Sequence, residues 1–225
     1  MTNHISPIFW LWVPLAFFIT QIFIEIFAPD EFVSGIVSEN GLYEVLQALI
    51  VFVGFIICLV YFFSKKTDKH PYYITWFGLA AVCCLYVVGE EISWGQHLFN
   101  WATPEGWSEL NDQNETNLHN MSSWFDQKLR LILLIAIVFG SLILPYLLSK
   151  KVIKLSAKLT KLCPPKEFGV LGLLVLVPHI VDKILETQGI SFFNRFSEVQ
   201  ELYFFYFVAF YLLNLYKITS KSEKS

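Results

Sequence analysis

The sequence has few charged side chains and lacks the compact motifs of several well-known enzyme classes. Charged residues make up 16% of the 225 positions, whereas hydrophobic residues make up 55%. No Gly-x-Ser-x-Gly nucleophile elbow, no P-loop and no His-Glu-x-x-His zinc motif occurs. These absences argue against a serine hydrolase of that kind, a P-loop nucleotide-binding enzyme and a zinc protease. The composition argues against an ordinary soluble domain.

Cysteine is scarce, and its four positions form no pairing pattern. Cys58, Cys83 and Cys84 lie inside apolar runs, Cys163 lies in a Lys-rich segment, and no Cys-x-x-Cys pair occurs. A disulfide framework is therefore not expected. We interpret the cysteines as small apolar residues that pack within helices.

The chain also lacks a Gly/Ser-rich or Pro-rich linker and an internal repeat. We therefore predict one domain over residues 1–218, followed by a polar tail over residues 219–225. No basic segment and no Ala-x-Ala cleavage signal precede Asp30. We expect the first apolar run to be retained as a membrane span.

Long apolar runs are the main feature that the sequence does contain. About 20 apolar residues cross a bilayer core of about 30 Å. The predicted fold class is all-α, a polytopic transmembrane bundle of about six helices. The predicted spans are Ile8–Phe27, Leu42–Phe63, Tyr72–Val88, Leu131–Leu148, Phe168–Val181 and Val199–Tyr216.

Positive charge gives this bundle a predicted orientation. Of the 16 Lys and Arg residues, three lie in 65–69, six in 150–166 and three in 217–224. Cytoplasmic loops of membrane proteins carry an excess of Lys and Arg, so these segments and both termini are expected in the cytoplasm. The expected location is a bacterial inner (plasma) membrane.

The basic segment over residues 149–167 has a helical charge pattern. Lys151, Lys154, Lys158 and Lys161 recur at three- and four-residue steps with apolar residues between them. This predicts a short amphipathic helix on the anionic inner leaflet, with a solvated basic loop as the alternative. Neither indicates nucleic-acid binding, because the net charge is −3 and topology explains the basic residues. The expected partner is the lipid bilayer, and the oligomeric state stays open.

Acidic side chains show the opposite distribution. Only Asp68, Glu167 and Glu223, of 19 Asp and Glu residues, lie on the predicted cytoplasmic side. Any chemistry is therefore expected on the outer side. The cytoplasmic halves of the spans carry no charged side chain, which argues against a conducting path. The acidic residues at outer span ends include Glu39, Glu44, Glu90, Glu91, Asp182, Glu186, Glu198 and Glu201.

The third span ends in the stretch Gly-Glu-Glu-Ile-Ser-Trp-Gly-Gln-His. Its two adjacent carboxylates, Glu90 and Glu91, lie at a helix C-terminus, where the helix dipole disfavours anions, so another partner must stabilise them. If the helix continues, Glu90, Trp94 and His97 share one face and Glu91 points about 100° away. A Ser-His-carboxylate arrangement using Ser93 and His97 at i, i+4 is an alternative.

The longest outer loop covers residues 96–130 and contains or adjoins four tryptophans. Tryptophan favours the headgroup level of a membrane, so we expect the loop at the outer interface. Thr103 followed by Pro104 predicts a helix start. Glu115 and His119 are i, i+4 partners if residues 111–119 are helical.

Polar side chains also mark the outer ends of other spans. His179, Asp182 and Glu186 fall at i, i+3 and i+7 at the end of the fifth span. If these stripes converge, several carboxylates and up to three imidazoles meet. The alternative is that they cap helix N-termini or form a hydrogen-bonded network that fixes helix register. The pairs that begin the second and sixth spans are Glu44 with Gln47 and Glu198 with Glu201.

Convergence of these residues predicts a site with acid/base and metal ligands. A mix of His and carboxylate ligands suits zinc, iron or manganese, and a bound metal activates water with a spare Glu as general base. The predicted catalytic residues are Glu90, Glu91 and His119. The predicted metal ligands are His97, Glu115, His179 and Asp182. The predicted supporting polar residues are Glu44, Ser93, Trp94, Gln96, Asn117, Glu198 and Glu201.

Several polar segments of the chain, taken together, form a recognisable set. They are Glu39–Glu44, Gly89–Gln96, Thr103–Glu105, Glu115–Asn120 and the helix opening Glu198–Glu201. This set resembles a family of uncharacterised bacterial multi-spanning membrane proteins. The resemblance covers the second to the sixth span, and it implies the fold but no activity. In that family an Arg often follows the residue that matches Gln96, whereas this chain has His97.

Three functions are compatible with the sequence. The first is a membrane-embedded, metal-assisted hydrolase or transferase that acts on lipid headgroups or lipid-linked glycans at the outer leaflet. The second is a protein that binds a cation or proton, or senses one, without turnover. The third is an accessory subunit. A polar site on one side only favours an enzyme or a sensor over a pore.

Overall fold

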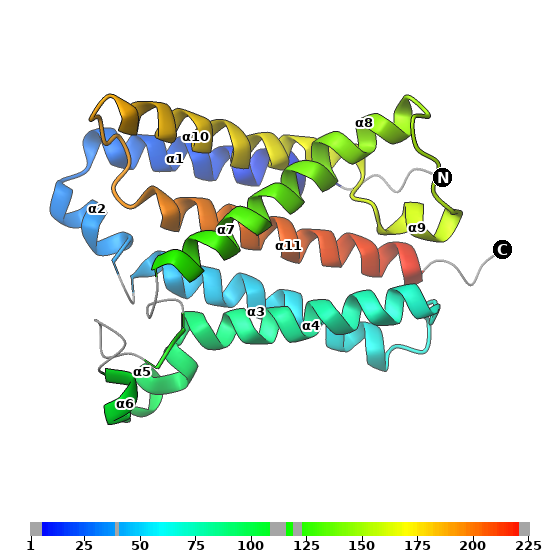
Figure 1. Cartoon of the computed structure of the whole chain (residues 1–225), viewed down its shortest axis with the longest axis horizontal. Coiled ribbons are helices and arrows are strands. Elements are labelled where there is room, and N and C mark those ends of the chain that lie inside the picture. Colours follow the sequence, from blue (N-terminus) through cyan, green and yellow to red (C-terminus); the bar gives the residue numbers. More distant parts are fainter. Residues whose placement is uncertain (1–5, 39–40, 109–115, 119–122, 221–225) are drawn as a thin grey trace.

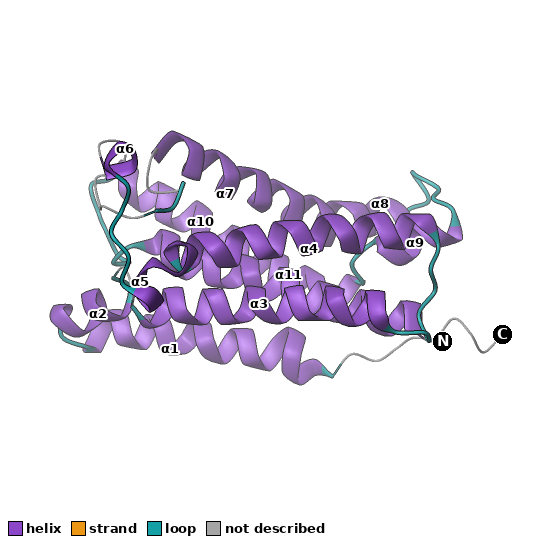
Figure 2. Cartoon of the chain, turned by 90° about the horizontal axis from the view of Figure 1, so that it is seen from below, coloured by secondary structure: helices purple, strands orange, loops and turns teal. Residues whose placement is uncertain are grey.

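The computed structural model describes residues 6–38, 41–108, 116–118 and 123–220, and within these ranges every regular element is helical (Figures 1 and 2). Six helical stretches are long and apolar enough to cross a membrane. They comprise a π-helical turn Ile8–Trp12 with α1 (Val13–Phe27), then α3 (Leu42–Phe63), α4 (Pro71–Glu91), α7 (Ser123–Val138) with a π-helical turn Phe139–Ile143 and α8 (Leu144–Ser149), α10 (Gly169–Thr187) and α11 (Phe196–Ser220). Short helices lie in the connections: α2 (Asp30–Ile36), α5 (Gln96–Phe99), α6 (Glu105–Ser108) and α9 (Ala157–Leu162).

The first two spans have the predicted bounds, and the third, fifth and sixth run further toward polar residues than predicted. Inside a bilayer, each backbone group must be hydrogen-bonded within the helix, so a helix does not end where its side chains become polar. The fifth span was predicted to end at Val181, but α10 passes Pro178 and continues to Thr187. This extension keeps Asp182 and Glu186 on the same helix as His179.

Helix α11 forms the centre of the bundle. Of its most apolar stretch, 67% is buried, whereas no other span exceeds 33%. It packs against α3, α10 and α7, and α4 packs on α3 (Figure 1). Because neighbours surround α11, its sequence is aromatic and aliphatic all round, as expected for a helix without a lipid-facing stripe.

The two ends of the bundle differ in charge. One end carries the loop 64–70, the segment 149–167 and the C-terminus of α11, together with both ends of the described chain (Figure 1). We call it the basic end. The opposite end, where α4 and α10 finish and α3 and α11 begin, is called the acidic end. The loops that were predicted to share a side therefore do so, while the orientation toward the cytoplasm stays a prediction.

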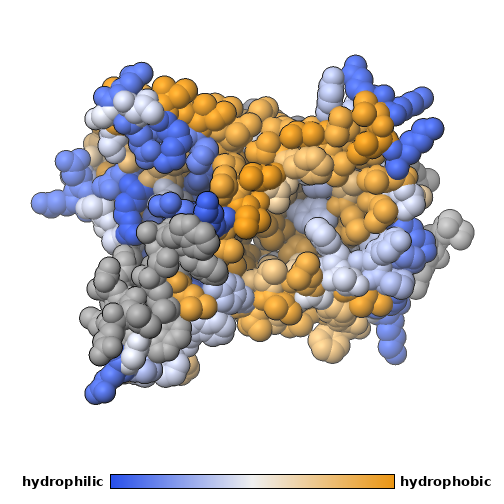
Figure 3. Space-filling model, in the orientation of Figure 1, coloured by the Kyte–Doolittle hydropathy of each residue, from blue (hydrophilic) through white to orange (hydrophobic). Residues whose placement is uncertain are grey.

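An apolar band separates the two ends. In Figure 3 orange side chains fill the middle of the molecule, and blue ones gather at both ends. Large apolar side chains such as Leu79, Val82 and Ile132 are more than half exposed there. This surface is consistent with contact with a lipid bilayer.

The predicted amphipathic helix in the segment 149–167 is shorter than expected. Helix α9 covers only Ala157–Leu162, and the side chain of Ser156 accepts a hydrogen bond from Leu159 N (3.3 Å) as its N-cap. Lys151 has a positive φ of 57° in a turn. The chain therefore reverses before α9, and only Lys158 and Lys161 of the predicted stripe lie on a helix.

Helix α7 crosses α10 at close range. A Cβ atom built on Gly172 of α10 would lie 2.1 Å from Ser141 Oγ in the π-helical turn after α7. Ser141 Oγ donates a hydrogen bond to Ile137 O (2.6 Å), within its own helix. The missing side chain of Gly172 thus permits this crossing, which leaves α7 diagonal to α11 in Figure 1.

Candidate functional site

The chain turns sharply after Glu91, the last residue of α4. Ser93, Trp94 and Gly95 have positive φ values of 46°, 52° and 88°. Positive φ is uncommon for residues other than Gly and is found at functional or tightly constrained positions. The prediction of one continuous helical face for Glu90, Trp94 and His97 is therefore wrong. The helix that would place Ser93 and His97 one turn apart also ends before them.

The turn folds Trp94 back onto α4. Trp94 Nε1 donates a hydrogen bond to Glu90 Oε1 (2.9 Å), and the indole ring lies against Gly89. A Cβ atom on Gly89 would lie 2.9 Å from that ring, so a glycine is required at this position. Local packing thus links Gly89, Glu90 and Trp94 of the Gly-Glu-Glu-Ile-Ser-Trp stretch.

Glu90 connects the segment Thr116–Leu118 to α4. Its side chain is 4% exposed, and its second oxygen accepts a hydrogen bond from Leu118 N (2.6 Å). Next to it, Asn117 Nδ2 donates to Ser93 Oγ (3.1 Å). One oxygen of Glu90 therefore accepts from the turn and the other from the loop, which favours a positioning role for this carboxylate.

Gln96 extends the same network. Its Oε1 accepts a hydrogen bond from Thr116 N (2.8 Å), and its Nε2 donates to Thr103 Oγ1 (2.8 Å). The predicted supporting residues Ser93, Trp94, Gln96 and Asn117 thus belong to one loop-anchoring network. Helix α6 begins at Glu105, next to the predicted start. The described residues Thr116–Leu118 are not helical, so a continuous helix over residues 111–119, the condition for pairing Glu115 with His119, is not present.

Glu91 faces a different group of side chains. It interacts electrostatically with Glu201, Glu198 and Glu44, and also with Arg130 of α7. Arg130 Nε forms an ion pair with Glu201 Oε1. We call Glu44, Glu91, Glu198 and Glu201 the carboxylate cluster. The acidic ends of α3, α4 and α11 therefore bring four predicted residues together beside one arginine.

Two members of the cluster also stabilise helix starts. Glu44 and Glu198 lie in the first turns of α3 and α11, where the helix dipole favours an anion. Gln47 Nε2 donates to the backbone oxygen of Glu198 (2.9 Å), which fixes α3 against α11. Arg195 Nη2 lies 3.5 Å from Glu198 Oε1. Glu44 and Glu198 can therefore stabilise helix N-termini, the alternative role given above, and also belong to the cluster.

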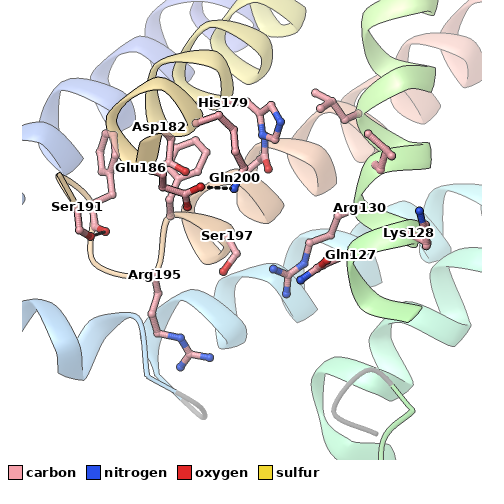
Figure 4. A pocket seen from close by; sticks show the side chains of 15 residues that line it. Gln127, Lys128, Arg130, His179, Asp182, Glu186, Ser191, Arg195, Ser197 and Gln200 are labelled. Carbon is pink, nitrogen blue, oxygen red and sulfur yellow. Dashed lines mark hydrogen bonds and ion pairs between the residues drawn. The ribbon is translucent and has the colours of Figure 1, made fainter. Parts of the chain in front are cut away.

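A polar pocket of about 630 Å³ adjoins the cluster between α7, α10 and the start of α11 (Figure 4). His179, Asp182 and Gln200 line one side, and Arg130 and Lys128 project from α7 on the other. Arg130 thus lines the pocket and also pairs with Glu201 of the cluster.

Two polar atoms in the wall of this pocket are buried without a hydrogen-bond partner in the described part of the chain. They are Gln200 Nε2 and His179 Nδ1, and Gln200 is only 7% exposed. A buried polar group costs about 1–3 kcal/mol when it is left unpaired. Asp182 is 8% exposed beside them. These groups are therefore suited to bind a polar ligand.

The predicted metal site is not assembled by the described residues. Among them, no three His, Cys, Asp or Glu side chains lie close enough to hold a metal ion. His179 and Asp182 share the pocket, but Glu186 pairs with Lys183 at 2.7 Å on the exposed rim. Glu115, His119 and the side chain of His97 lie outside the described residues.

Two important residues were not among the predicted ones. Arg130 is one of four basic residues on the predicted outer side, and that rarity was a usable signal. Gln200 lies directly before Glu201, but no spacing rule distinguishes it from other glutamines.

Comparisons with protein-family models, curated proteins and solved structures found no match. The resemblance carried by the Gly89–Gln96 stretch stays a prediction.

Proposed function

We propose that the protein is a membrane-embedded hydrolase or transferase whose reaction centre is the carboxylate cluster, with the polar pocket as the site for a lipid or lipid-linked headgroup. The observation that carries this proposal is the convergence of Glu91, Glu201 and Arg130 from three helices at the acidic end. The proposed setting is the outer leaflet of a bacterial inner membrane.

The cluster offers both partners for acid/base catalysis. Neighbouring carboxyl groups, one holding a proton and one without, supply a general acid and a general base. Glu201 is ionised in its pair with Arg130 and is assigned as the base that takes a proton from water or an acceptor hydroxyl. Arg130 stabilises negative charge that develops on the substrate, as fixed charges do in water-poor sites. Glu91, buried among the other carboxylates, is assigned as the acid that gives its proton to the leaving group, and the proton taken up by Glu201 replaces it.

The predicted zinc, iron or manganese ion has no role in this assignment. His179 and Asp182 supply two donors in the pocket, and the described residues supply no third. The two side chains are instead assigned to hold the polar head, together with Gln200. All three side chains line the pocket, and His179 Nδ1 and Gln200 Nε2 have no hydrogen-bond partner among the described residues.

The first experiment compares turnover in Glu91→Gln with Glu31→Gln as a matched control. Glu31 is an exposed carboxylate in the first turn of α2 and does not line the polar pocket. Vesicles made from a bacterial total lipid extract serve as substrate, and mass spectrometry measures lipid products. We expect a loss of about 10²–10⁴-fold in Glu91→Gln and less than about twofold in the control. No product with the wild type, or equal rates in both variants, contradicts the proposal.

Proton or cation binding without turnover is a second candidate function. It is favoured by the excess of carboxylates over arginines in the cluster, which invites a further positive charge. Its test is proton uptake by purified wild type between about pH 5 and pH 8, measured in weakly buffered detergent solution. Uptake that disappears in Glu91→Gln, with no lipid product in the wild type, supports binding over catalysis.

A further inference from the structure

An apolar groove of about 480 Å³ runs between α4 and α7, with α11 as its floor. Figure 1 shows α7 diverging from α4 over α11, and Figure 3 shows an apolar, hollowed surface there. Leu162, Cys163 and Pro164 close it toward the basic end. Its volume lies in the range of small-molecule sites, about 300–1,000 Å³.

The floor and mouth of the groove are held in place by side-chain contacts. Tyr211 of the floor donates a hydrogen bond to Leu162 O (2.6 Å), and its ring packs edge-to-face on Trp76 at 6.3 Å. The Tyr211 hydroxyl on the floor therefore has its hydrogen-bond partner within the protein. At the rim, Leu79 is 60% exposed and Phe139 is 47% exposed, so the groove is open sideways to the apolar surroundings. A ligand from the bilayer could therefore enter without crossing water.

The helical register connects this groove to the carboxylate cluster. Residues 7 or 11 apart lie on nearly the same face of an α-helix, because both steps are close to whole numbers of turns. Glu91 is 11 residues from Ala80, and Arg130 is seven residues from Ile137. Glu201 is likewise seven residues from Val208. Each of the three helices thus places one charged side chain (Glu91, Arg130 or Glu201) about 10–17 Å along the same face from the groove lining.

Charge restricts the head that could lie at that end. The cluster holds four carboxylates, and Arg130 and Arg195 are the two cations shown to interact with it. An anionic head would meet excess negative charge, whereas a cationic or neutral head would not. The groove has apolar walls, and the carboxylates lie beyond it at the acidic end. This arrangement matches an amphiphile with one long chain.

We propose that the groove binds one hydrocarbon chain of an amphiphile, and that the group joining this chain to the head lies at the carboxylate cluster and carries no negative charge. A larger head extends past Arg130 into the polar pocket. The assignment of the joining group rests on the proposed function, because it places the reacting bond beside Glu91. The binding of the chain stands on the groove alone. The inference therefore specifies the substrate class as a chain-bearing lipid without negative charge next to its chain.

The experiment uses photoactivatable probes with the same 16-carbon diazirine chain and three heads: trimethylammonium, alcohol and sulfonate. The full-length protein in nanodiscs is irradiated with each, and labelled residues are mapped by mass spectrometry. We expect labelling concentrated on groove residues such as Leu79, Leu133 and Ala136. The sulfonate probe is expected to label about tenfold less than the other two. Labelling spread evenly over the apolar band contradicts the groove, and equal labelling by sulfonate contradicts the assignment of the joining group.

Filling the groove provides a matched pair of variants. Ala136→Trp places an indole in the groove, whereas Ala16→Trp places one on an exposed position of α1 outside it. Groove labelling should fall at least about fivefold in the first and stay unchanged in the second. Leu79→Trp at the rim serves if Ala136→Trp does not fold. If the groove is labelled and Glu91→Gln still turns over lipid at the normal rate, the proposed function is contradicted. The chain-binding site is then still supported.

Discussion

At the scale of single residues, the junction after α4 shows how one turn sets the roles of two adjacent carboxylates. The positive φ values of Ser93, Trp94 and Gly95 bring Trp94 back onto Glu90. Glu90 is thereby engaged with the loop, and Glu91 is left facing the cluster. The sequence indicated that the two adjacent glutamates needed partners. It did not indicate which glutamate bonds to the loop and which belongs to the cluster.

The Trp94 turn has a measurable contribution to stability. Trp94→Phe keeps a ring against Gly89 and removes the hydrogen bond from Nε1 to Glu90 Oε1. Loss of a bond to a buried carboxylate is expected to lower the free energy of unfolding by about 1–3 kcal/mol. Thermal melting in detergent measures this, with Trp101→Phe, an exposed loop position, as control. Equal melting temperatures for both variants would show that the hydrogen bond contributes nothing.

At the scale of helices, apolar length predicted the spans well and their ends poorly. The first two spans match the predicted bounds, because Pro29 lies two residues after the first, Ser64 follows the second directly, and the apolar runs stop with the helices. The later spans extend because backbone hydrogen bonding continues past the last apolar residue. Whether the polar stripes meet depends on the angles at which the helices cross. The periodicity within one helix does not contain those angles.

The crossing of α7 and α10 is expected to fail when its glycine is replaced. Gly172→Ala places a Cβ atom against Ser141 Oγ and should destabilise by about 1–3 kcal/mol, as overpacking does. Ser141→Ala removes that oxygen, so the double variant should regain part of the loss. Melting temperatures of both singles and the double measure the coupling. Strictly additive effects would mean that the two positions do not meet.

At the scale of the whole molecule, charge divides the bundle into a basic and an acidic end. The fold class was predictable because apolar length is a property of sequence alone, and the structure confirms a bundle with six such helices. Helix α11 at its centre was not predictable, since every span is apolar enough to face lipid. The same limit explains why the polar pocket, formed by three helices, was not foreseen.

Orientation is tested by thiol accessibility in intact cells. In a variant without native cysteines, Glu105→Cys lies at the acidic end and Lys65→Cys at the basic end. The positive-inside rule predicts that a membrane-impermeant maleimide reaches the first in intact cells and the second only after permeabilisation. The reverse pattern would place the cluster on the cytoplasmic side.

The central claim is that α4, α7 and α11 form one reaction centre at the acidic end. The most direct test exchanges the charges of the ion pair between Arg130 and Glu201. Each single change, Arg130→Glu or Glu201→Arg, should cost about 10²-fold or more in lipid turnover and lower the melting temperature. The double exchange restores the pairing of α7 with α11, and we predict recovery of most of the melting temperature and about tenfold in turnover. A double variant no better than the worse single would contradict the account.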